Sequence, residues 1–443
     1  MRTLATFAEL VADAARMWLT AFPALGMWFC LGFVLDRGLF QAAITVGGGH
    51  AYLALLLFIL GVLASVAATV LMIGALEPQL TRLALLRERT ANDPKLPVTA
   101  TLDPDTSRGV TLALALGPFL AVYALWGLVD DRIRELFVAN QIRYSLNPDA
   151  WSIDLRRWQG YLLLALIAWL IKLAAGALHR RFGRPALAGL AVLADGVFVF
   201  ASFLGLYRAT TQLVDWLTGR VVWQWVSRAW RGFLEALPNL RLPFDLTLPE
   251  AVADTGRWLT ATGLPALGQY LLLPLVWLAL TAVVFGWRTV HEIDAGSRLG
   301  RLTGRLTKTW EPLGRVVDLA TLDVREKYLP VWRALRLIAA AGPRFIGCYL
   351  LAATALSWLR GGFEMLTTTV IGPVPAEQML FLGPLTELLT GLVFSTLAIA
   401  LYAAAFDRCL LTARRVREPS RAAVPGRQPG SGTRTRVPAS RPS

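Results

Sequence analysis

The chain has 443 residues, of which 55% are hydrophobic and only 17% are charged. A soluble domain is nearer 25% charged, and apolar stretches of about 20 residues, the length that crosses a bilayer, recur along this chain. These features exclude an ordinary soluble globular protein and predict an all-α integral membrane protein. The net charge is +14 and comes from 40 Arg and only 4 Lys among the basic residues, a bias typical of a GC-rich bacterial genome.

The hydropathy pattern predicts a polytopic bundle of about eight membrane-spanning helices. The predicted spans are residues 15–35, 51–76, 111–129, 159–178, 186–207, 266–287, 337–359 and 384–407. Residues 1–418 form the predicted transmembrane bundle. Residues 419–443 are rich in Pro, Gly, Ser and Arg and have no apolar periodicity, so we predict a disordered basic cytoplasmic tail.

The distribution of basic residues predicts that both termini lie in the cytoplasm. With the N-terminus inside, the cytoplasmic segments hold 30 basic residues and the outer segments hold 13. This asymmetry is the one that orients proteins in the plasma membrane. We therefore expect a multi-pass plasma-membrane protein. Because topology accounts for the basic charge and no aromatic stacking pattern accompanies it, no nucleic-acid partner is expected.

A faint internal repeat runs through the predicted spans. Prolines lie in or near the first half of the odd-numbered spans, at Pro23, Pro118, Pro185 and Pro343, and tyrosines followed by leucines open three even-numbered spans, at Tyr52, Tyr161 and Tyr270. The pattern predicts four helical hairpins, each crossing the membrane out and back. A chance recurrence of residues that are common in spans is the alternative interpretation.

Two of the predicted outer loops, residues 130–158 and 208–265, are long. The second places Leu213, Trp216, Leu217, Val221, Trp225 and Trp230 at helical spacing, interleaved with Arg220, Arg228 and Arg231. Trp and Arg in this pattern favour an amphipathic helix that lies in the bilayer interface. Such a segment would cover the outer mouth of the bundle or dock a partner, and an ordinary aromatic belt is the alternative.

The predicted cytoplasmic loop 288–336 is densely basic. Leucines fall on roughly one helical face, and Arg298, Arg301, Arg305 and Lys308 are threaded between them. Basic amphipathic segments adhere to anionic membrane surfaces. These four residues are therefore candidates for lipid-surface contact, and a solvated loop is the alternative. Membrane lipids are the expected partners, together with other membrane proteins docked through loops 208–265 and 288–336.

Two ionisable residues are predicted to lie at membrane depth. Lys172 is about six residues from the cytoplasmic end of its span, or ~9 Å deep, and Asp195 is about nine residues in, or ~14 Å deep. A charge inside the membrane is costly and usually functional. We therefore predict an intramembrane pair across the hairpin that turns at residues 180–184, acting as a proton- or ion-linked switch or as a polar lining. The alternative is that Lys172 extends to the phosphates alone and Asp195 is protonated or hydrogen-bonded.

Acidic residues also occur at the predicted ends of spans. Asp130 and Asp131, like Asp36 next to Arg37, lie at outer ends, where a transferase that uses polyprenyl-linked substrates would need a carboxylate. Asp130 and Asp131 are therefore weak catalytic candidates, and helix capping is the alternative. Glu387 and Asp407 are expected to lie at the interface without a chemical role.

No catalytic, cofactor or metal motif is present in the sequence. Gly47–Gly49 is followed by no Gly-Lys-Ser/Thr of a phosphate loop, the three histidines have no metal-ligand spacing, and no Gly-x-Ser-x-Gly occurs. We therefore expect no cofactor and no metal, and lean towards a non-enzymatic protein. The sequence favours scaffolding or lipid handling in envelope biogenesis, with a secondary transporter or channel as the alternative and a polyprenyl-lipid-dependent transferase as a second alternative.

Overall fold

The computed structural model describes residues 2–47, 50–85, 119, 132–136, 138–139, 158–238, 240, 247–293, 334–335, 338–339 and 341–422. The elements are α1 (Arg2–Val46), α2 (Ala51–Ala75), η1 (Glu77–Gln79), α6 (Trp158–Phe182), α7 (Pro185–Thr218), α8 (Val221–Ala236), α9 (Leu248–Trp258), η4 (Leu259–Gly263), α10 (Leu264–Leu267), η5 (Gly268–Leu272), α11 (Leu273–Ile293), α14 (Pro343–Ile371) and α15 (Ala376–Ala422). This part of the chain is helical, which confirms the predicted all-α class. α15 continues to Ala422, four residues into the predicted tail 419–443, and the rest of that tail lies outside the described residues.

Within the described part of the chain, six helical segments are long and apolar enough to cross a membrane. They are Thr3–Val46, Tyr52–Gln79, Trp158–Phe182, Pro185–Thr218, Leu248–Phe285 and Leu382–Leu410, and each contains or overlaps one predicted span. These segments indicate a multi-pass integral membrane protein. Predicted span 111–129 lies outside the described residues except for Phe119. α14 overlaps predicted span 337–359 but is not one of the six, so the count of eight stays a prediction.

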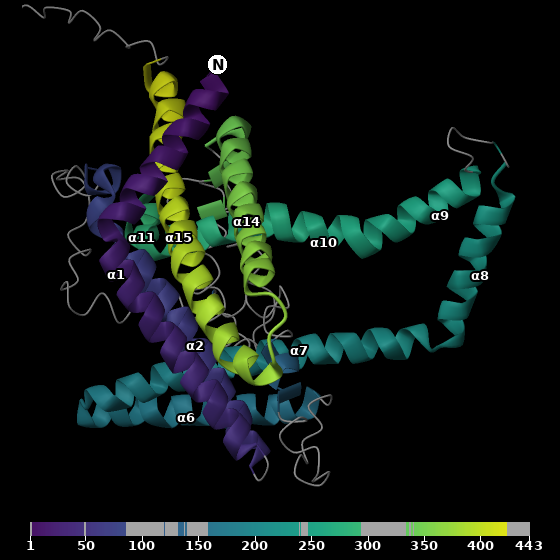
Figure 1. Cartoon of the computed structure of the whole chain (residues 1–443), viewed down its shortest axis with the longest axis horizontal. Coiled ribbons are helices and arrows are strands. Elements are labelled where there is room, and N and C mark those ends of the chain that lie inside the picture. The colour runs from purple at the N-terminus through teal and green to yellow at the C-terminus, as the bar shows by residue number, and fades with distance from the viewer. Residues whose placement is uncertain are drawn as a thin grey trace, which may run out of the picture.

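α1 and α15 lie side by side and antiparallel (Figure 1). The indole N–H of Trp18 donates a 2.9 Å hydrogen bond to Thr396 Oγ1, near the middle of the pair. Further along, Gly391 faces Phe29 so closely that a Cβ added to the glycine would lie 2.5 Å from Phe29 Cζ. The pair therefore keeps one register along its length and brings the N-terminal part of α1 to the C-terminal part of α15.

α2 packs against α1 through small residues. A Cβ added to Gly32 of α1 would lie 2.4 Å from the Cβ of Ala68, and one added to Gly61 of α2 would lie 3.1 Å from Asp36 Oδ1. Small residues let helix backbones approach this closely inside a membrane. α1, α2 and α15 thus form a tightly packed unit, and α11 and α14 pack onto it.

α6 and α7 form a second hairpin that runs across the direction of α1 (Figure 1). Gly183 makes the turn with a φ of +64°, a left-handed conformation that glycine adopts without strain. Pro185 follows in the first turn of α7, where its missing N–H is no loss. α7 meets α2 at Gly196, where an added Cβ would lie 2.7 Å from a methyl carbon of Leu63.

The described residues 206–238, 240 and 247–272, hereafter the arm, extend away from the bundle before α11 returns to it (Figure 1). The arm comprises the C-terminal part of α7, α8, α9, η4, α10 and η5. The described part of the predicted outer loop 208–265 is therefore largely helical. α8, α9 and the three segments up to Leu272 contain no buried residue.

Candidate functional site

Lys172 of α6 and Asp195 of α7 face each other across the second hairpin. Lys172 Nζ lies 2.7 Å from Asp195 Oδ1, a charge-assisted hydrogen bond. Both side chains are partly buried, at 26% and 20% exposed. Asp195 also precedes Gly196, where α7 packs closely against Leu63 of α2. A change in the charge of either partner would therefore act where the hairpin joins the bundle.

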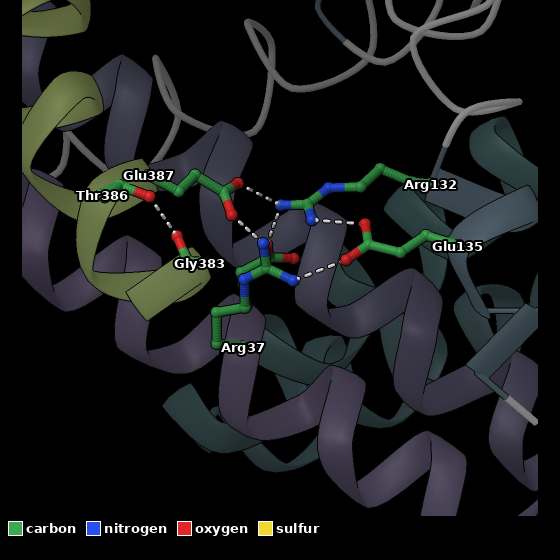
Figure 2. A network of polar contacts seen from close by, with 7 residues as sticks. Arg37, Arg132, Glu135, Gly383, Thr386 and Glu387 are labelled. Carbon is green, nitrogen blue, oxygen red and sulfur yellow. Dashed lines mark hydrogen bonds and ion pairs between the residues drawn. The ribbon is translucent and has the colours of Figure 1, made fainter. Parts of the chain in front are cut away.

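A second group of charged residues joins α1, residues 132–136 and α15, and Figure 2 shows its side chains pointing toward one another. Arg37 Nη1 lies 2.8 Å from Glu135 Oε1, and its Nη2 contacts Glu387. Arg132 lies 2.8 Å from Asp36, 3.0 Å from Glu135 and 3.7 Å from Glu387. We call these five residues the outer network, because the sequence predicts an outer location for all of them.

The outer network has two guanidinium groups and three carboxylates. Asp36 is the most enclosed member, with the whole residue 9% exposed. The Arg37 guanidinium carbon also lies 5.8 Å from the ring centroids of Phe33 and Phe40 on its own helix, within the range of cation–π attraction. Aromatic rings and carboxylates therefore fix Arg37 from several directions, which favours a structural latch over a free anion-binding group.

The pKa of Glu135 reports the balance of forces within this network. Burial acts to raise the pKa of this carboxyl, but hydrogen bonds from Arg37 and Arg132 and their positive charges act against burial. The result is a pKa below the ordinary glutamate value. Glu135 is therefore held in its charged form, as an ion-pair partner and not as a proton donor.

A third group links the opposite ends of α1 and α15. Arg408 of α15 lies 2.6 Å from Asp13 and 2.9 Å from Glu9, both on α1. Its neighbour Asp407 is only 3% exposed, and Arg82, just after α2, approaches it at 3.5 Å. We call this group the inner network, because the sequence predicts cytoplasmic locations for these helix ends. α1 and α15 are thus ion-paired near both ends.

α8 carries a different kind of feature. Its polar side chains Gln224, Arg228, Arg231 and Glu235 recur at intervals of four, three and four residues, with Ser227 beside them, which places them on one stripe of the helix. The rest of its circumference is apolar and includes exposed valines, tryptophans and a phenylalanine: Val221, Val222, Trp223, Trp225, Val226, Trp230 and Phe233. This apolar face is uncovered by the described part of the chain.

Other predicted site residues fall outside the description. Asp130 and Asp131, and the basic residues Arg298, Arg301, Arg305 and Lys308 of predicted loop 288–336, lie outside the described residues. Asp36, the other predicted outer-end acid, is engaged by Arg132. Among the described residues, no group of three or more His, Cys, Asp or Glu side chains is placed to hold a metal ion.

Sequence reasoning identified Lys172 and Asp195 as one candidate pair but missed both networks. It considered Asp36, Arg37 and Glu387 only as isolated charges at helix ends, and it gave no role to Glu9 or Asp13. The available signal was that these charges of opposite sign lie at span ends that the topology assigns to one side. Comparison of the chain with protein-family models, curated proteins and solved structures gives no match.

Proposed function

We propose that the protein is a non-enzymatic multi-pass plasma-membrane protein that handles lipid, or scaffolds other components, in the biogenesis of the cell envelope. The observation that carries the proposal is the arm. Its helix α8 has an apolar face with side chains such as Trp225, 61% exposed, and Val222, 65% exposed. Exposed apolar patches of this kind mark sites of contact with lipid or with another protein.

The ion pairs favour a rigid core from which the arm extends. Alternating access requires one group of packed helices to move against another. α1 and α15 are instead paired near both ends, by Arg37 with Glu387 and by Arg408 with Asp13. Close glycine contacts such as Gly32 with Ala68 hold α2 against the same unit. A fixed core that carries a lipid-facing arm suits scaffolding or lipid handling.

The same networks support the proposed topology of about eight spans with both termini in the cytoplasm. Each network gathers chain segments that the basic-residue count assigns to one side. The outer network draws on residues 36–37, 132–135 and 387, and the inner network on residues 9–13, 82 and 407–408. The opposite assignment for any one of these segments would separate it from its ion-pair partners.

The second candidate function is a secondary transporter or channel. The observation that favours it is the 2.7 Å contact between Lys172 and Asp195 inside two candidate spans. In this alternative a proton or cation that binds Asp195 releases Lys172 and loosens α7 from α6. The predicted four-hairpin repeat would supply the symmetry that such transporters use.

Native mass spectrometry of the full chain, purified in mild detergent from its own membrane, distinguishes these proposals. Lipid-handling predicts tightly retained lipid, and scaffolding predicts a protein partner at fixed stoichiometry. A bare monomer that retains neither would contradict the proposed function. It would leave transport as the proposal to test, with Lys172→Met and Asp195→Asn as the first variants.

A further inference from the structure

α8 has dimensions that match a membrane surface and not a membrane crossing. Its 16 residues extend ~24 Å at 1.5 Å per residue, whereas a spanning helix needs about 20 predominantly apolar residues. Arg228 and Arg231 also lie near its middle, where a spanning helix would place them deep in hydrocarbon. A helix that is apolar around most of its circumference, with one charged stripe, is stable when it lies along the interface.

The arginines are placed to meet the headgroup layer when the apolar face is buried. Arg228 Nε donates a 3.3 Å hydrogen bond to the carbonyl of Gln224, and Arg231 Nε donates a 3.4 Å hydrogen bond to the carbonyl of Ser227, one turn earlier in each case. These bonds hold both side chains along the polar stripe. Both residues are exposed.

A third arginine lies at the corner between α7 and α8. The Arg220 guanidinium stacks over the Trp216 ring, 4.3 Å from its centroid, which fixes the cation beside an aromatic ring of the kind that settles at membrane interfaces. From Arg220 to Arg231 the chain carries three positive charges and no acidic residue, and Glu235 is the first acid to follow.

We propose that α8 binds the phosphate groups of anionic phospholipids, with Trp223, Trp225 and Trp230 in the acyl boundary and Arg220, Arg228 and Arg231 at the headgroups. This inference rests on the proposed lipid-handling function and adds the chemical class of the ligand. The positive run complements an anionic headgroup, and guanidinium forks match phosphate oxygens in two-point hydrogen bonds. Continuity of the arm with the candidate span Pro185–Thr218 brings α8 to the bilayer surface.

The test compares two lipids that differ in headgroup charge. Full-length protein in mild detergent receives equal amounts of phosphatidylglycerol and phosphatidylcholine, and native mass spectrometry measures the ratio of bound species. Each basic residue near an anionic surface adds about 1 kcal/mol, or about fivefold. We expect Arg228→Gln with Arg231→Gln to lower the preference for phosphatidylglycerol about tenfold to twenty-five-fold, and Arg228→Lys with Arg231→Lys to retain most of it.

The matched control removes two other exposed arginines, by Arg257→Gln on α9 with Arg360→Gln on α14. Each is paired with a carboxylate on its own helix, Asp254 or Glu364, so the control should keep the wild-type preference. An unchanged ratio of bound phosphatidylglycerol to phosphatidylcholine in the α8 variant, or an equal fall of this ratio in the control, would overturn the assignment of the headgroup site to α8. Neither result would contradict lipid binding by the protein. Wild-type protein that retains neither lipid would overturn the proposed lipid handling as well.

Discussion

Arg37 is one of the two arginines that hold the outer network together. It joins α1 to residues 132–136 through Glu135 and to α15 through Glu387, and its side chain is only 20% exposed. Arg37→Gln keeps a polar side chain but shortens it and removes the charge. After this change the two glutamates keep Arg132, which lies 3.0 Å from Glu135 and 3.7 Å from Glu387, so the loss is partial.

The expected cost follows from these contacts. The two glutamates are about 40% exposed, which places each ion pair near the upper part of the exposed range of 0.2–1 kcal/mol. Loss of the cation–π contact with Phe33 or Phe40 adds roughly 0.5–1 kcal/mol. Together these terms give a loss of about 1–3 kcal/mol in the free energy of unfolding.

SDS titration in mixed micelles measures this free energy for the full chain. A double-mutant cycle with Glu387→Gln should give a coupling of about 0.5–1 kcal/mol, the value expected for their one ion pair. Arg360→Gln is the matched control, since its pair with Glu364 on the same helix is about half exposed, and we expect less than about 0.5 kcal/mol. If Arg37→Gln lowers the free energy of unfolding no more than this control does, or if the cycle gives no coupling, then Arg37 does not hold the helices together as proposed.

Three further predictions use the same titration. Lys172→Met and Asp195→Asn should each lower the free energy of unfolding by about 1–3 kcal/mol, because each change leaves the other partner without its opposite charge. The double variant should lose less than the sum of the two. Strictly additive losses would rule out the pair. Gly32→Ala should lower the free energy of unfolding by about 1–3 kcal/mol, because the new Cβ would lie 2.4 Å from that of Ala68. Gly38→Ala, which has open space around it, should be neutral or stabilising. Similar effects at the two glycines would contradict the close packing of α1 and α2. Because the folded pKa of Glu135 is lowered from 4.5, its ion pairs should stabilise the fold above about pH 4.5 and lose that effect as the pH falls through the lowered pKa; a Glu135→Gln variant with the wild-type acid profile would refute this.

The helical class, the six candidate spans and the hypothesis of a Lys172–Asp195 pair could all be reached from the sequence for the same physical reason. A bilayer imposes a length of about 20 apolar residues and makes a charge within that length conspicuous. Lys172 and Asp195 stand out because they interrupt such runs, and the short turn between their helices limits how far apart they can lie. Local information was therefore sufficient for them.

The two networks and the arm were harder to predict because they depend on packing between distant segments. Arg37 and Glu387 are 350 positions apart, and only the antiparallel register of α1 and α15 brings them together. The amphipathic pattern around Trp225 was visible in the sequence, but the largely helical arm that leads from it to α11 was not. Leu259–Gly263 forms a π-helical turn at the end of the predicted outer loop 208–265. A second π-helical turn, Gly268–Leu272, lies inside predicted span 266–287.

The location of α8 in the membrane interface tests the central claim most directly. Spin labels introduced singly at positions 222 to 233, in a variant whose three cysteines are replaced by alanine, can be measured in lipid nanodiscs for collisions with oxygen and with a water-soluble nickel chelate. We predict a helical period, with labels at Trp225, Val226 and Phe233 favouring oxygen and labels at Arg228 and Arg231 favouring the nickel chelate. Equal access of the nickel chelate to every position would show that α8 stands in water, and the proposed lipid-facing arm would be wrong.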